Sequence, residues 1–186
     1  MNVRRALLAA LALATLAGCA EGQLLGLPSG PYRATGLSPL PNATGDDGTP
    51  LYRLELAGGV VYDVQARIDG GQISVRSRVE NGTDGPVRIA LGRAALIERE
   101  GTNLTLARVE DDPGWTPDPE ERESAPWKAG QRTIPPGKAI AVTRRYKLAS
   151  APMDGSGIAR LGRVQFRDEV QAGGRAQPVK VELVRD

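Results

Sequence analysis

Residues 72–87 read QISVRSRVENGTDGPV, and this stretch decides the fold class. Apolar Ile73, Val75 and Val79 alternate with polar residues, which is the period-two pattern of a strand with one buried face. Residues 81–86 are a dense turn signal, and apolar residues alternate again from Val87 onward. The pattern predicts two antiparallel strands joined as a β-hairpin.

Short strand-like segments follow one another along the rest of the chain, separated by glycine, proline and asparagine. After the first nineteen residues, no segment has apolar residues at a sustained helical spacing. We therefore expect an all-β protein, an antiparallel sandwich or barrel of about 7–9 strands. The predicted strands are 51–56, 60–68, 73–79, 87–91, 94–100, 103–109, 139–148, 161–170 and 179–184, and the pair around Gly101 is predicted to be a second hairpin.

Residues 73–87, together with Ile134-Pro-Pro-Gly137 leading into a strand, resemble immunoglobulin-like domains of bacterial envelope lipoproteins. In those domains a strand ends in Asn and a small polar turn, the next strand opens on a Pro-Val pair, and a later Pro-Gly opens another. The resemblance covers roughly residues 60–184. It implies an immunoglobulin-like β-sandwich without the Cys…Trp…Cys framework of antibody domains, and it implies no activity.

The first nineteen residues have the pattern of a bacterial lipoprotein signal. Arg4 and Arg5 precede an apolar run, 6–16, that is shorter than the ~20 residues needed to span a bilayer. The run ends in Leu16-Ala17-Gly18-Cys19, which resembles the lipobox: small residues recognised by the signal peptidase, then the cysteine that receives diacylglycerol. The alternative is an ordinary secretory signal, cut after Ala17 or Ala20.

The lipobox predicts a membrane partner and a location. Lipoproteins of this kind use an aspartate after the cysteine as an inner-membrane retention signal, and this chain has Ala20 there. We therefore expect the outer membrane, with the protein facing the periplasm. A single acyl chain binds membranes only marginally, so the anchor implies multiple acylation, palmitate included.

Three parts of the chain are predicted: a signal peptide (1–18), the lipidated cysteine with a Gly/Pro-rich tether (19–50), and a β-sandwich (51–186). Glycine and proline recur too often in residues 20–50 for a helix or a long strand. The alternative is that part of this segment packs as an N-terminal strand around Tyr32.

Composition excludes several classes of function. The formal charge of +2 disappears with Arg4 and Arg5, since the remaining 22 basic residues equal the 22 acidic ones. A neutral surface gives no general attraction for nucleic acid. The chain has no histidine and a single cysteine, so Ser-His-Asp and Cys-His catalysis and histidine-ligated metals are excluded. No cofactor is expected.

Residues 110–130 form a polar, proline-interrupted segment with two candidate features. Asp111, Asp112 and Asp118 are weak candidates for a Ca²⁺ site, against which a solvated acidic loop is the simpler interpretation. Trp115 and Trp127 either pin this segment onto the sandwich or form a contact loop for a partner in the envelope.

Arginines mark one more pattern in the predicted strands. Arg76, Arg78 and Arg145 alternate with apolar neighbours, which indicates an outward sheet face, either a cationic stripe or simply solvated. Arg144 has the parity of inward residues and therefore needs a carboxylate partner.

The sequence thus favours a non-enzymatic, lipid-anchored interaction or structural module of the bacterial envelope. Two alternatives stay open: a periplasmic protein that binds a small ligand or Ca²⁺, and a hydrolase that uses paired carboxylates.

Overall fold

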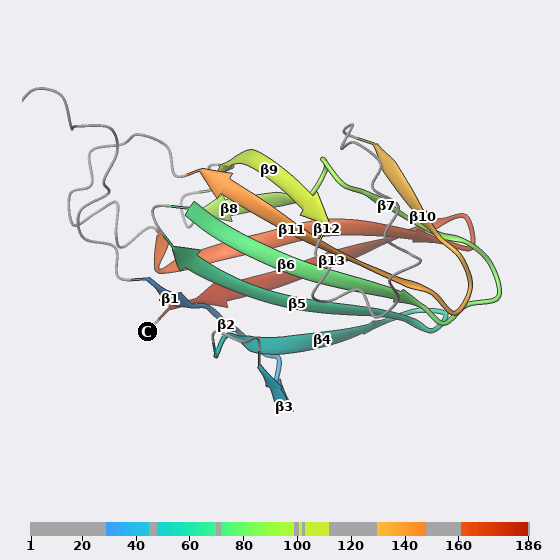
Figure 1. Ribbon diagram of the computed structural model, residues 1–186, viewed down its shortest axis with the longest axis horizontal. Helices are drawn as coiled ribbons and strands as arrows, with labels where there is room; N and C mark the ends of the chain where they lie inside the picture. Colours follow the sequence, from blue (N-terminus) through green and yellow to red (C-terminus); the bar gives the residue numbers. More distant parts are fainter. Residues whose placement is uncertain are drawn as a thin grey trace, which may run out of the picture.

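Two antiparallel sheets pack face to face in the computed structural model, which describes residues 29–44, 48–69, 72–98, 101, 103–111, 130–147 and 161–185 (Figure 1). Sheet A contains β1 (Gly30–Pro31), β3 (Pro39–Thr44), β4 (Pro50–Leu56), β5 (Val60–Asp69), β6 (Gln72–Asn81), β9 (Thr105–Asp111) and β11 (Ala139–Lys147). Sheet B contains β2 (Arg33–Ala34), β7 (Val87–Ala90), β8 (Ala95–Glu98), β10 (Gln131–Ile134), β12 (Arg163–Ala172) and β13 (Arg175–Val184). The predicted all-β sandwich is confirmed.

Seven of these strands follow the order of an immunoglobulin domain. In sheet A, β5, β6, β11 and β9 are neighbours in that order, and in sheet B the order is β13, β12, β7. When these seven strands are lettered A to G in chain order, sheet A has the strand order A-B-E-D and sheet B has the order G-F-C. These are the two sheets of the immunoglobulin fold. The other strands extend or complete the two sheets, so the described residues hold thirteen strands, more than the sequence pattern predicts.

The core follows from the alternation along the strands. In β6 every second residue from Ile73 to Asn81 is buried, and the intervening residues are partly exposed. Side chains from both sheets meet between them, with Tyr62 of sheet A and Phe166 and Leu183 of sheet B fully buried. Burial of each such side chain contributes about 1.5–3 kcal/mol, which makes this layer the main source of stability.

The predicted tether is wrong for its described residues, 29–44 and 48–50. β1 pairs with β5, β2 pairs with β13, and the Tyr32 ring between them is fully buried. The Tyr32 hydroxyl donates a 3.0 Å hydrogen bond to the Leu161 carbonyl. The alternative interpretation, a segment packed around Tyr32, is therefore correct for these residues, because strand pairing and the buried ring hold the segment against both sheets.

The turn at Asn81 does not close a hairpin, in contrast to the prediction. β6 pairs with β5 on one edge and with β11 on the other, so it has no free edge for β7, which belongs to sheet B. The second predicted hairpin is also wrong. β8 pairs with β12 and β9 with β11, and only the bridge between Ile97 and Asn103 links the two segments.

Asn81 instead holds the crossing between the sheets. Its carboxamide donates hydrogen bonds to the carbonyls of Gly85 and Ile134, both at 2.8 Å, and its Oδ1 accepts from the Thr83 amide and hydroxyl at 2.9 and 2.7 Å. Its backbone carbonyl accepts from the Gly137 amide at 2.7 Å. The two sequence strings that carry the immunoglobulin-like resemblance are thus joined through one residue.

Candidate functional site

Most of the sites predicted from sequence lie outside the described residues. These are Leu16, Ala17, Gly18 and Cys19 of the lipobox, the acidic Asp112 and Asp118, and both tryptophans, Trp115 and Trp127. Asp111 is the last residue of β9, and only its backbone is described.

Arg144 points inward, as its parity predicts, and lies in a charged cluster between the sheets. Its side chain is fully buried, and its Nη2 lies 3.2 Å from Oδ2 of Asp168, which comes from sheet B. Its Nε donates to the Leu91 carbonyl at 3.1 Å and its Nη1 to the Ser77 hydroxyl at 2.8 Å. The Tyr62 hydroxyl donates to the same Asp168 oxygen at 2.7 Å.

Burial and charge determine the protonation of this cluster. Burial and the negative charge of Asp168 raise the pKa of Tyr62 well above its usual value. Burial alone would lower the pKa of Arg144, but Asp168 together with Tyr62 and Tyr146 outweighs it, and the pKa is raised. The Tyr62 hydroxyl and the ion pair of Arg144 and Asp168, all closed off from solvent, join the two sheets. This arrangement is structural, and it offers no group to a ligand.

The outer face of sheet A, which points away from sheet B, carries the polar residues that alternate with the core. Strand register sets them in rows across β5, β6, β11 and β9. One row is Gln65, Arg76, Thr143 and Glu110, and the next is Arg67, Ser74, Arg145 and Arg108. Sheet faces of this kind normally stay open to water, yet Gln65 is only 2% exposed.

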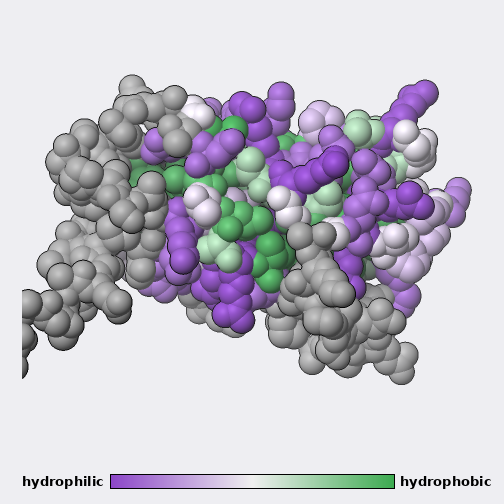
Figure 2. All heavy atoms as spheres, turned by 90° about the horizontal axis from the view of Figure 1, so that it is seen from above, coloured by the Kyte–Doolittle hydropathy of each residue, from purple (hydrophilic) through white to green (hydrophobic). Residues whose placement is uncertain are grey.

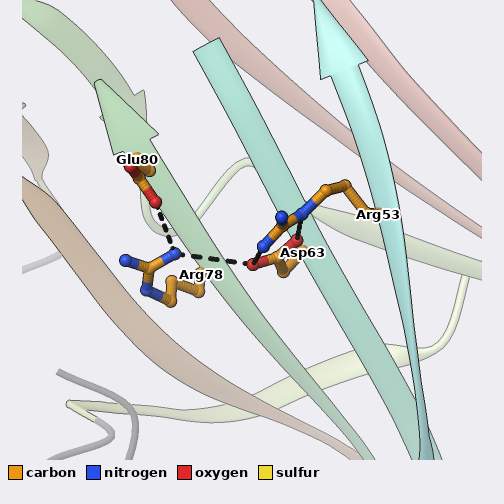
Figure 3. A network of polar contacts seen from close by, with 4 residues as sticks. All are labelled: Arg53, Asp63, Arg78 and Glu80. Carbon is orange, nitrogen blue, oxygen red and sulfur yellow. Dashed lines mark hydrogen bonds and ion pairs between the residues drawn. The ribbon is translucent and has the colours of Figure 1, made fainter. Parts of the chain in front are cut away.

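One part of this face carries a network of ion pairs among four residues (Figure 3). Asp63 accepts two hydrogen bonds from Arg53, at 2.7 and 3.0 Å, and lies 3.5 Å from Arg78. Arg78 also contacts Glu80 at 2.8 Å. The hydrogen bonding of Arg53 to the Asp63 carboxylate raises the pKa of Arg53. Two cations and two anions balance here, so the network leaves no net charge for a partner.

The other part of the face is hollowed. A pocket of about 340 Å³ lies over the adjoining ends of β5, β6, β9 and β11. Its described lining is polar: Thr49, Gln65, Arg67, Asp69, Ser74, Arg76, Glu110, Thr143 and Arg145, with Ala66 between them. The volume is at the small end of the range for ligand sites. We take this pocket as the candidate functional site and call it the Ser74 pocket.

Three arginines and two carboxylates give the described lining of the Ser74 pocket a net positive charge. Both carboxylates are engaged: Glu110 contacts Arg108 and, at 3.2 Å, Arg145, whereas Asp69 accepts a 3.0 Å hydrogen bond from Ser29 and lies 4.0 Å from Arg67. Gln65 differs from them. Its Oε1 is buried and accepts no hydrogen bond from the described residues. A buried acceptor without a donor costs about 1–3 kcal/mol, which a bound ligand could recover.

A second surface feature lies at the edge of the sandwich formed by β9. Seen from above, this edge shows hydrophobic surface between hydrophilic side chains (Figure 2). The inward residues of β9, Leu106 and Val109, pack against the core but are only partly buried. No strand pairs with the second edge of β9 among the described residues.

Neither metals nor membrane-spanning helices are indicated in the described part of the chain. No three acidic side chains in this part of the chain form a group that could hold a metal ion. It also contains no helix of the length and hydrophobicity needed to cross a membrane.

Comparison with protein-family models and with curated proteins gave no match for this chain.

Sequence reasoning placed part of the site correctly. Arg76, Arg78 and Arg145 do share an outward face, but each lies near a carboxylate, so the face is mixed in charge and not a cationic stripe. The reasoning missed Gln65 and Ser74. The sequence does contain one signal for the pocket: Ser74 is a small residue among the long polar residues that face outward. Only the register of the strands shows which of those residues surround it.

Proposed function

We propose that the chain is a lipid-anchored protein of the bacterial envelope whose β-sandwich is a non-enzymatic interaction module. The sequence Leu16-Ala17-Gly18-Cys19 supports the anchor, and Ala20 supports the outer membrane, facing the periplasm. The Ser74 pocket is the observation that carries the binding role. It combines a recess in an otherwise flat sheet with a buried acceptor, Gln65 Oε1, that lacks a donor.

The position of the pocket fits a role close to the membrane. Nine residues lie between Cys19 and Ser29, and the ten Cα–Cα steps that join these two residues span at most about 35 Å. β1 follows directly and pairs with Arg67 and Ile68, at the end of β5 where the pocket lies. An anchor at Cys19 would therefore hold the Ser74 pocket within a few tens of ångströms of the lipid surface.

Of the alternatives, a periplasmic protein that binds a small ligand is favoured by the same pocket. The hydrolase has less support. Asp69 and Glu110 both line the pocket, but they come from β5 and β9, three strand spacings apart. That is about 14 Å between backbones, whereas paired carboxylates of glycosidases lie about 5–9.5 Å apart.

The anchor is tested by changing Cys19→Ser and, separately, Ala20→Asp in the native cell. We expect the Cys19→Ser protein to leave the membrane fraction and to escape processing by the lipoprotein peptidase. The Ala20→Asp protein should stay lipidated but move to the inner membrane. A Cys19→Ser protein that fractionates with the membrane would contradict the proposed anchor.

The interaction role is tested with a photo-cross-linking amino acid at Ser74 and, as a matched control, at Lys180 on the exposed face of sheet B. We expect irradiation of intact cells to give a reproducible envelope adduct from position 74 and none from position 180. Equal labelling from both positions, or from neither, would argue against the Ser74 pocket as the contact surface.

A further inference from the structure

We propose that the Ser74 pocket binds a small anionic sugar, either free or as the terminal residue of a glycan. The shared chemistry is a ring with several hydroxyls and one carboxylate or phosphate. This inference rests on the proposed binding role of the pocket and names the class of ligand.

Ser74 forms the floor of the site. In its row Ser74 lies between Arg67 and Arg145, and Arg76 lies two residues along the same strand. Cross-strand neighbours are about 5 Å apart, and residues two apart on one strand about 7 Å. One short side chain is thus enclosed by three long cationic ones, which explains why the hollow forms here and not over the network of Asp63.

The charges select an anion. Arg67, Arg76 and Arg145 all line the pocket, and the guanidinium group of arginine is suited to bidentate contacts with carboxylate and phosphate. Glu110 pairs with Arg108 and Arg145, and Asp69 lies 4.0 Å from Arg67, so the two carboxylates reduce the positive charge of the three arginines without cancelling it. Arg67 and Arg145 are 30% and 43% exposed, open enough to meet a ligand.

The remaining polar groups of the pocket favour a ligand that carries hydroxyl groups. Gln65 Oε1 is buried in the wall and needs a hydrogen-bond donor, which an anionic group alone cannot supply. Ser74, Thr49 and Thr143 add hydroxyls to the lining. The described lining has no aromatic side chain and one small apolar residue, so an apolar ligand would bury polar groups without partners. At about 340 Å³ the pocket suits one sugar ring.

Binding is measured by isothermal titration calorimetry on the full chain in a polyoxyethylene detergent, which avoids sugar-based head groups. The probes are glucuronate and glucose 1-phosphate. The controls are glucose, which lacks the anionic group, and inorganic phosphate, which lacks the sugar ring. We expect both anionic sugars to bind at least ten-fold more tightly than either control. Methyl glucuronide, which mimics a glycan end, separates the sources: equal binding indicates a terminal residue, and its loss indicates the free sugar.

Variants locate the binding. Ser74→Glu places a carboxylate on the floor and should weaken glucuronate binding at least ten-fold, whereas Ser74→Ala keeps the space and should change it less than three-fold. Gln65→Leu should weaken the sugars but leave inorganic phosphate unaffected. A thermal melt of each variant confirms the fold.

The proposal is overturned if no probe binds, if a control probe matches the sugars, or if folded Ser74→Glu binds like the unmodified chain. Because this assay needs neither lipid nor partner, its failure is distinct from failure of the anchor or of cross-linking.

Discussion

At the scale of single residues, the buried polar groups of this protein differ in the partners that the fold supplies. Arg144 and Asp168 are buried at the centre of the sandwich, and their contacts include Ser77, Tyr62 and the Leu91 carbonyl. Gln65 is buried on the opposite face of sheet A, and its Oε1 accepts nothing from the described residues. The first set holds the sheets together, and the proposed ligand of the Ser74 pocket would supply the donor that the second lacks.

Arg144→Met should destabilise the protein by about 3–5 kcal/mol, because the buried Asp168 carboxylate would lose the cation that balances it. Adding Asp168→Asn removes that charge and keeps an acceptor for Tyr62, so the double variant should regain about 2 kcal/mol over the single one. Urea unfolding measures both.

Arg163→Met is the matched control. Arg163 is 60% exposed and contacts Glu182 at 3.4 Å, so the loss should be below about 1 kcal/mol. A double variant no more stable than Arg144→Met would show that the uncompensated charge is not the cause.

At the scale of elements, the passage from β6 to β7 depends on close backbone contact as well as on Asn81. The Gly82 amide donates a 3.1 Å hydrogen bond to the Gly59 carbonyl, in the turn between β4 and β5. A Cβ on Gly82 would lie 2.5 Å from that oxygen. The glycine is required by the neighbouring turn, not by its own backbone conformation.

Gly82→Ala should therefore cost about 1–3 kcal/mol through overpacking against Gly59. Gly85→Ala, in the same turn, should change stability by less than about 0.5 kcal/mol, since a Cβ there meets nothing within 4 Å. Thermal or urea unfolding of the two variants compares them directly. Similar losses at both positions would mean that turn flexibility and not the close approach is decisive.

At the scale of the whole molecule, three buried tyrosines link stability to alkaline pH. Burial raises the pKa of Tyr32, Tyr62 and Tyr146 in the folded state, above the usual value of about 10 that they have when unfolded. Above that pH the unfolded chain releases tyrosine protons that the folded chain retains. The free energy of unfolding must therefore fall as pH rises, and the contribution is fully present below pH 10.

Urea unfolding between pH 8 and 11.5 should show a stability that falls once the pH exceeds about 10, with a limiting slope of about 1.4 kcal/mol per pH unit for each of the three tyrosines. Tyr146→Phe should reduce that slope by about one third. A stability that stays constant to pH 11.5 would contradict the buried, neutral tyrosines.

Local pattern alone was sufficient to predict the fold class, because side chains on a strand alternate between two faces and the alternation is written in the order of residues. The same parity predicted that Arg144 points inward and that Arg76, Arg78 and Arg145 share the outward face. The lipobox is likewise a local pattern, and it stands as a prediction from Leu16-Ala17-Gly18-Cys19.

Tertiary structure alone decided which strands become neighbours. Pairing joins residues far apart in the chain, so nothing local shows that the turn at Asn81 crosses between sheets or that Tyr32 anchors the N-terminal segment. The Ser74 pocket has the same origin. Its arginines come from β5, β6 and β11, and only the register of those strands places them around one serine with the buried oxygen of Gln65 beside it.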